Sequence, residues 1–209
     1  FTPVGATHMA DKGTCGLASP FREALICDEH GNELPPGETG ELCLTGAGLF
    51  LGYYKKPKAN RESFHGRWFR TGDLATMDEN GYVFIVGRIK EMIKRSGENI
   101  SAAEVEAVLR EHVHVYEAAA VAVPDEKRME EVKVYVSLRN EKTKADITPD
   151  ALIEHCKQRL APFKIPRYFA YVDDFPRTGT EKIAKPQLVQ DCPDLRLGAY
   201  DRVEAIWRD

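Results

Sequence analysis

The sequence has no apolar run long enough to form a transmembrane helix. Its longest apolar stretch, Ala118 to Val123, falls far short of the roughly 20 residues that a spanning helix needs. The first residues, FTPVGATHMADKG, contain no charged segment followed by an apolar one, so nothing there indicates a secretory leader. We therefore expect a protein without a transmembrane segment that is located in the cytoplasm.

Paired cysteine motifs are also absent. The odd number of scattered cysteines and the lack of a CxxC pair argue against a disulfide framework and a zinc site, and favour reduced thiols in a cytosol. The cysteines are Cys15, Cys27, Cys43, Cys156 and Cys192. His112 and His114 lie near no third ligand in the sequence, so we expect a helix end and a loop there, and no metal.

No charge of either sign dominates. The formal net charge is -4, with 43% hydrophobic and 30% charged residues over 209 positions. This composition is typical of a globular protein, and its mild acidity gives no reason to expect a nucleic-acid partner. The length suits one large domain or two small ones. The oligomeric state is left open.

The first part of the chain shows short apolar runs separated by turn-forming residues. Residues 24–27, 41–45 and 81–87 read as strands, and the segment DEHGNELPPGETG between the first two is dense in turn formers. No long helical pattern precedes residue 100. We therefore predict a β-rich unit over residues 1–87.

Helices and strands alternate farther along the chain. Ser101 and Glu104 form a capping box that begins an amphipathic helix, and Thr148 followed by Pro149 begins a second helix, which Pro162 ends. Three strands are expected at 118–123 (buried), 132–138 (half-buried, with Lys133, Tyr135 and Ser137 on its polar face) and 168–172. We predict an α+β domain over residues 91–191 and a tail with little pattern over 192–209.

Three short motifs carry candidate chemistry. In WFRTGDL, Asp73 follows a glycine that permits a tight turn, so its carboxylate can accept two donors such as adjacent ribose hydroxyls; it can equally cap its own backbone. In GRIKEMIKRSGENIS, clustered cations beside Gly97 suit a phosphate, or simply form a solvated hairpin. In FPRTGTEKIAK, Lys182 can bring a positive charge to two anions, or is an ordinary surface lysine.

Four segments in a fixed order resemble one enzyme superfamily. These are GETGELCLTGAGLFLGYYKKP, IKRSGENISAAEVE, PDEKRMEEVKVYV and KIPRYFAYVDDFPRTGTEKIAK. They are similar to motifs of the adenylate-forming superfamily of acyl-CoA synthetases, luciferases and peptide-synthetase adenylation domains. The resemblance extends from about Leu25 to Leu188. The KRSGEN segment is most similar to that of carnitine-type and fatty-acid CoA ligases.

The resemblance implies an ATP-dependent carboxylic acid–CoA ligase that makes an acyl-adenylate and then an acyl-CoA. Its substrates are a carboxylic acid, ATP and CoA, and Mg²⁺ is bound mainly through the nucleotide and an upstream half. Residues 1–87 correspond to the β-rich end of the AMP-binding N-terminal domain. Residues 88–90 correspond to the hinge, and residues 91–191 to a mobile C-terminal domain. The acid itself is not identified.

The same resemblance assigns residue roles. Asp73 accepts hydrogen bonds from the ribose hydroxyls, and Arg88 contacts the ribose and phosphate region. Lys90 matches the hinge position. Lys182 matches the catalytic lysine that contacts the carboxylate and the α-phosphate during adenylation. A swing of the C-terminal domain brings a further set toward the CoA thiol and phosphates, namely Ser96, Gly97, Glu98 and Arg128.

Two residues depart from the family pattern. Glu181 stands before Lys182 where the family usually has glycine, and Met129 replaces the usual glycine after Arg128. The phosphate-binding loop and the acyl pocket have no counterpart here, and no initiator Met precedes Phe1. We therefore expect Phe1 to lie inside a longer chain, and this piece to be inactive alone.

Other functions remain compatible with the motifs. An adenylation domain that loads a carrier protein shares them, although such modules continue into a carrier domain and this sequence ends about 27 residues after Lys182. A luciferase-type oxygenase shares them too. A non-catalytic nucleotide- or CoA-binding module is the alternative outside enzymes.

Overall fold

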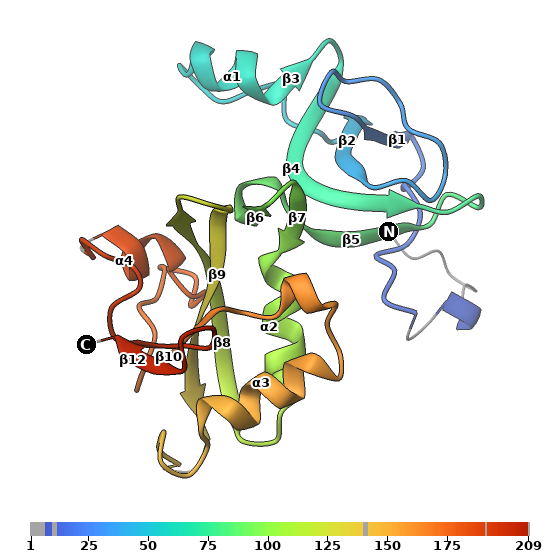
Figure 1. Cartoon of the computed structure of the whole chain (residues 1–209). Coiled ribbons are helices and arrows are strands. Elements are labelled where there is room, and N and C mark those ends of the chain that lie inside the picture. Colours follow the sequence, from blue (N-terminus) through green and yellow to red (C-terminus); the bar gives the residue numbers. More distant parts are fainter. Residues whose placement is uncertain (1–6, 10–11, 140–141, 191, 209) are drawn as a thin grey trace. The chain divides into compact units, whose positions relative to one another are not determined.

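The chain forms two compact units in a computed structural model that describes residues 7–9, 12–139, 142–190 and 192–208 (Figure 1). Unit 1 is Phe1–Lys90 and unit 2 is Glu91–Asp209. Both contain mixed helices and strands, which confirms the predicted α+β class. Among the described residues, no helix is long and apolar enough to cross a membrane.

Unit 1 is built on a five-stranded antiparallel sheet with the order β1-β2-β4-β3, in which β5 pairs with β4. Its small core contains Ile26, Leu42, Ala75 and Val83. The predicted strands 24–27 and 41–45 lie within this sheet, and 81–87 does so from Val83 onward. The elements are β1 (Arg22–Cys27), β2 (Gly40–Gly46), α1 (Pro57–Ser63), β3 (Phe64–His65), β4 (Trp68–Met77) and β5 (Val83–Arg88), with 3₁₀ turns at Thr7–Met9 and Ile89–Glu91.

Unit 2 is built on a seven-stranded sheet with the order β12-β11-β10-β9-β6-β7, in which β8 pairs with β9. The β9–β10 pair is parallel. Its strands are β6 (Met92–Arg95), β7 (Glu98–Ser101), β8 (Val115–Asp125), β9 (Met129–Leu138), β10 (Tyr168–Tyr171), β11 (Ala199–Asp201) and β12 (Ile206–Arg208), and its helices are α2 (Ala102–Arg110), α3 (Pro149–Lys157) and α4 (Lys185–Gln190), with a 3₁₀ turn at Pro162–Lys164.

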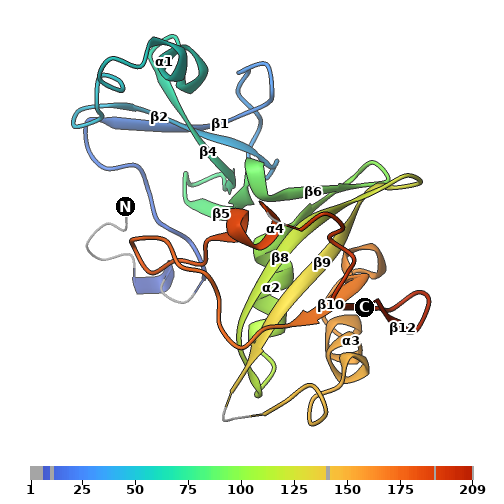
Figure 2. The same cartoon turned by 90° about the vertical axis from the view of Figure 1, so that its left-hand side faces the viewer.

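The two longer helices, α2 and α3, cover one face of this sheet (Figures 1 and 2). The Ser101 side chain caps α2 by accepting a hydrogen bond from the Glu104 N–H at 3.4 Å, which satisfies one of the backbone donors left open at a helix start. Val105 and Leu109 are fully buried against the sheet. This Ser101 cap therefore begins the helix where the sequence predicts.

Strand β9 is buried on both faces, so the half-buried prediction is wrong. Val132, Val134 and Val136 pack under α2 and α3. On the opposite face Lys133 is only 1% exposed and Tyr135 only 9%. The Lys133 ammonium donates to the carbonyls of Leu195 and Leu197 at 2.7 and 3.0 Å. The segment after α4 covers this face and satisfies the lysine, and strand periodicity cannot reveal such a cover.

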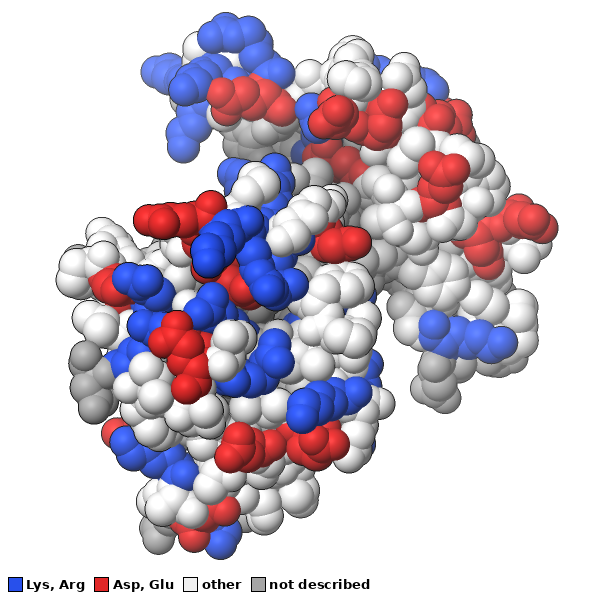
Figure 3. Space-filling view, viewed as in Figure 1, with Lys and Arg blue, Asp and Glu red and all other residues white. Residues whose placement is uncertain are grey.

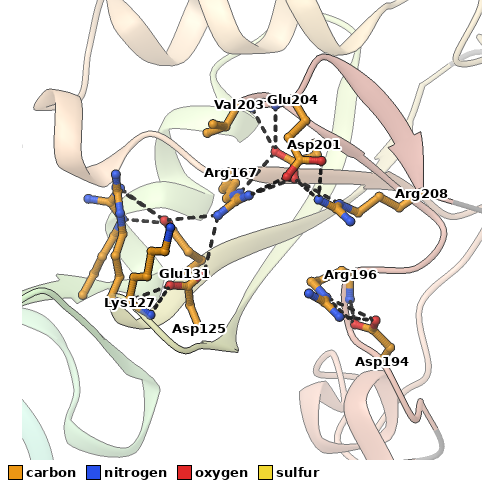
Figure 4. Close-up of polar contacts among 12 residues, drawn as sticks. Asp125, Lys127, Glu131, Arg167, Asp194, Arg196, Asp201, Val203, Glu204 and Arg208 are labelled. Carbon is orange, nitrogen blue, oxygen red and sulfur yellow. Dashed lines mark hydrogen bonds and ion pairs between the residues drawn. The ribbon is translucent and has the colours of Figure 1, made fainter.

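The C-terminal residues also add strands to the sheet, which corrects the expectation of a patternless tail. Strands β11 and β12 pair antiparallel with each other, and β11 pairs with β10. The carboxylate of Asp201, which is fully buried, accepts from Arg167 at 3.1 and 3.2 Å and from Arg208 at 2.8 and 3.0 Å (Figure 4). Burial alone would raise the pKa of Asp201, but these two guanidinium groups lower it.

Candidate functional site

Asp73 and Arg88, two of the predicted nucleotide-contacting residues, face each other in unit 1. They are register partners on β4 and β5, and Arg88 Nε lies 2.9 Å from Asp73 Oδ1. The side chain of Asp73 is 27% exposed and that of Arg88 is 62% exposed. An acceptor-only carboxylate therefore stands beside a guanidinium with several donors, at a surface that a ligand can reach.

The RTGD motif lies inside strand β4, so its interpretation as a turn is wrong. The chain still departs from regular strand geometry there: Gly72 has φ +74°, and the β2–β4 register shifts between Glu41 and Cys43. A Cβ at Gly72 would meet no atom within 4 Å. The left-handed backbone, and not lack of space, therefore requires glycine.

A buried glutamate on the neighbouring strand holds this irregular segment. Glu41, 6% exposed, accepts from the Gly72 N–H at 3.0 Å and from Arg70 at 2.6 and 2.7 Å. Thr71 Oγ1 accepts from the Asp73 N–H at 3.0 Å and donates to the Leu42 carbonyl at 2.8 Å. These bonds fix the backbone from which the Asp73 side chain projects.

Lys90 lies in the 3₁₀ turn Ile89–Glu91 and is the last residue of unit 1. Its assignment as a hinge stays a prediction.

Within the described part of the chain, no group of three or more His, Cys, Asp or Glu residues could hold a metal ion.

The predicted thiol-side residues come together in unit 2. Ser96 and Gly97 form the turn between β6 and β7, with φ +52° and +87°, and Glu98 begins β7. The Ser96 N–H donates to the Arg128 carbonyl at 2.9 Å, so this turn lies against the turn between β8 and β9. Figure 3 shows basic side chains gathered over β6 and the neighbouring end of β9, with acidic ones among them.

Glu131 connects these two turns, and the sequence interpretation missed it. Its side chain is 2% exposed. It accepts from Arg95 at 2.7 and 3.3 Å and lies 3.4 Å from Arg128 Nη1. A buried carboxylate that pairs with cations from two segments fixes their spacing. The Arg128 side chain remains 45% exposed and so is accessible to an anion.

Lys182 is exposed on the loop between β10 and α4, as expected. Among the described residues of unit 2, none of the other predicted site residues forms a hydrogen bond or ion pair with Lys182. The residue before it, Glu181, has φ +62°, and Met129 after Arg128 has φ +67°. Both departures from the family pattern therefore occupy the left-handed conformation that favours glycine, which explains why glycine is usual at these two positions.

Family models and a curated relative match this sequence. Residues 2–54 match the family model "AMP-binding enzyme", and residues 104–182 match "AMP-binding enzyme C-terminal domain". The chain is 39% identical, over 84% of its length, to a long-chain-fatty-acid–CoA ligase of Escherichia coli O6:H1, of which it covers 31%. It therefore spans about a third of the length of that curated relative.

Solved structures are similar as well. The o-succinylbenzoate CoA synthetase of Bacillus subtilis, in complex with its acyl-adenylate intermediate, matches with a TM-score of 0.80 and 32% identity, over 90% of this chain and 38% of that one. An amide bond synthetase of Marinactinospora thermotolerans matches with a TM-score of 0.77 and 30% identity, over 85% of this chain and 36% of that one.

Proposed function

Because this chain belongs to the AMP-binding enzyme family as the C-terminal part of a member, we propose that it is part of an ATP-dependent carboxylic acid–CoA ligase. The pairing of Asp73 with Arg88 beside an accessible surface supports this function most directly. In the first step a substrate carboxylate oxygen attacks the α-phosphorus of ATP, and pyrophosphate leaves. In the second step the thiol of CoA attacks the acyl carbon, AMP leaves, and the thiol proton is released.

Unit 1 would contribute to nucleotide binding. The Asp73 carboxylate suits two adjacent ribose hydroxyls because it has only acceptors to offer. Arg88 offers charged donors to a phosphate. The bond from Gly72 to Glu41 holds the strand before the ligand arrives, so that less ordering remains on binding.

Lys182 would act in the first step. The substrate carboxylate and the triphosphate are both anions, and a positioned ammonium offsets their repulsion and stabilises the charge of the transition state. Holding both reactants also reduces the entropic part of the barrier. Removal of Lys182 by rotation of unit 2 about Lys90 would then let one cavity serve both steps.

The turn at Ser96 and Gly97 would act in the second step. The exposed, left-handed Gly97 allows close backbone approach to a pantetheine arm, and Arg128 suits a CoA phosphate. The described residues offer no cluster of three metal ligands. From the family resemblance, we assign Mg²⁺ mainly to the nucleotide and to upstream residues of the full-length protein.

The experiment is an assay of AMP release from ATP by the full-length protein, across a panel of carboxylic acids, with and without CoA. We expect CoA-stimulated release with one class of acid, which would also identify the substrate. Acid-dependent pyrophosphate exchange without CoA turnover would show that the acyl-adenylate forms but that its acceptor is not CoA. No acid-dependent activity would contradict the ligase and favour a binding module.

The Lys182→Ala variant tests the assigned catalytic residue. Adenylation should fall strongly, while thioester formation from pre-made acyl-adenylate should stay nearly intact. Lys157→Ala is the matched control, because this lysine is exposed on α3 and pairs with the exposed Glu154 at 3.3 Å. Equal losses in both half-reactions would exclude the proposed role of Lys182.

A different acceptor is the second candidate function. The similarity to an amide bond synthetase shows that the fold of this chain also occurs in a protein named for amide bond formation. The acceptor would then be an amine, or the thiol of a carrier protein. Replacing CoA by amines and by a carrier protein in the same assay distinguishes these cases.

A further inference from the structure

The loop that carries Lys182 is closed on itself. Arg177 and Ile183 form an isolated antiparallel bridge, and the Thr178 N–H donates to the Lys182 carbonyl at 2.8 Å. The Ala184 N–H donates to the Pro176 carbonyl at 2.7 Å. Lys182 therefore projects from a short hairpin-like loop whose two ends meet at a common base.

One side of this base is fixed by a bidentate ion pair. The guanidinium of Arg177 donates to both carboxylate oxygens of Glu117 on β8, at 2.9 and 2.5 Å. The two side chains are 29% and 24% exposed. The pairing with Glu117 raises the pKa of Arg177. Two parallel charge-assisted bonds fix orientation as well as distance.

A β-bulge lies where Glu117 meets the loop. The β8–β9 register shifts between Val115 and Glu117, and the Ser137 hydroxyl accepts from the Glu117 N–H at 3.2 Å. Bulges commonly redirect a side chain. The bulge is therefore part of the local geometry that presents the Glu117 carboxylate to Arg177.

The other side of the base is fixed by Lys185, the first residue of α4. Its ammonium lies 2.7 Å from Glu106 Oε1 on α2 and also pairs with Glu91. Glu106 is only 10% exposed in its side chain and also accepts from the Ala120 N–H at 2.7 Å. Burial by itself would lower the pKa of Lys185, but the two carboxylates raise it.

We propose that Arg177–Glu117 and Lys185–Glu106 are positioning pairs that aim Lys182 at the reacting anions during adenylation. This inference rests on the proposed function, because it takes Lys182 as the adenylation lysine. A lysine on an unanchored loop samples many directions, and misplacement of a reacting group by about 1 Å can cost on the order of a hundredfold in rate. Anchors on both sides of the loop restrict that freedom without contacting the substrate.

The experiment compares the two half-reactions in the full-length protein. Arg177→Gln and Glu117→Gln should each slow adenylation by on the order of tenfold or more, and leave thioester formation from pre-made acyl-adenylate within about twofold. Arg177→Lys keeps the charge but loses the bidentate geometry, so it should fall between Gln and wild type. Lys185→Gln, on the other side of the loop, should show the same split.

The matched control is Arg159→Gln, which breaks the ion pair to Glu111 at 3.1 Å in the same unit and should leave both half-reactions unchanged. The positioning role is overturned if the variants at Arg177, Glu117 and Lys185 keep the full rate of adenylation. It is also overturned if the rates of both half-reactions fall together and in proportion to a loss of folding stability. If Lys182→Ala itself keeps adenylation, the proposed function of Lys182 fails instead. If Arg177→Gln is insoluble, the double variant Arg177→Glu/Glu117→Arg, which exchanges the two charges, replaces it. Recovery of adenylation in this double variant supports the positioning pair. A soluble double variant that does not recover adenylation overturns it.

Discussion

Glu41 accepts the backbone N–H of Gly72 at 3.0 Å, so a buried carboxylate on β2 fixes the residue before Asp73 on β4. Glu41→Gln keeps the shape but removes the charge that holds Arg70 and Gly72. We expect about tenfold higher KM for ATP, because charge-assisted hydrogen bonds contribute roughly 1.5–3 kcal/mol.

The control for this prediction is Glu23→Gln in the same sheet. Glu23 pairs with Arg67 at 2.6 Å, and both side chains are more than half exposed, so this change should alter KM for ATP by less than about twofold. An unchanged KM in Glu41→Gln would show that the Asp73 backbone does not need this carboxylate.

A glycine in place of Glu181 should stabilise the protein. Glu181 has φ +62°, and a left-handed conformation costs a non-glycine residue about 1–2 kcal/mol. Part of this gain is lost because glycine has more freedom when unfolded, so Glu181→Gly should add about 1 kcal/mol, measured by denaturant unfolding. Lys127→Gly, at a position without positive φ, should not stabilise. Equal effects of both changes would contradict the strain at Glu181.

A proline at Lys90 should slow the thioester step more than adenylation. Proline restricts φ to about −65°, and rotation at a hinge requires the backbone dihedrals to change. Single-turnover assays of each half-reaction in the full-length protein measure the split, with Lys90→Ala as the control that removes the side chain alone. If proline leaves both steps as in the alanine variant, the hinge lies elsewhere.

Acid should destabilise the protein through His112. Burial lowers the pKa of this imidazole, and His155 and His114 lower it further; their rings lie 5.2 and 5.8 Å away. The folded state thus binds fewer protons than the unfolded state, so stability is full above the ordinary value of 6.5 and falls as the pH drops below it.

Urea unfolding between pH 7.5 and 5.5 checks this prediction. His112→Asn should flatten the dependence, because the asparagine does not titrate while it can still accept the weak hydrogen bond from the His114 N–H. A pH dependence that is the same in the variant and the wild type would assign the acid sensitivity to other groups.

The sequence predicts those parts of the fold that depend on local signals. The N-cap at Ser101, the Pro149 helix start and the apolar run 118–123 all correspond to elements of the structure. Contacts between distant segments are not encoded locally. Glu117 and Arg177 meet across 60 positions, and the buried Asp201 of β11 pairs with Arg167 across 34 positions.

Lys133 shows most clearly why strand periodicity alone does not predict burial in this sheet. Its alternation with valines predicts a solvent-facing lysine, yet the segment 195–197 covers it and accepts both of its hydrogen bonds.

Lys133→Met fills a similar volume but leaves the two carbonyls without these donors. Hydrogen bonds from a charged donor contribute about 1.5–3 kcal/mol each. Because removing the buried charge also removes its desolvation cost, which offsets part of this contribution, we expect a loss of about 2–4 kcal/mol in denaturant unfolding. Lys157→Met, on the exposed face of α3, should cost less than about 1 kcal/mol. Similar losses in both variants would mean that the C-terminal segment is held by its apolar contacts and by Asp201, and not by the buried ammonium.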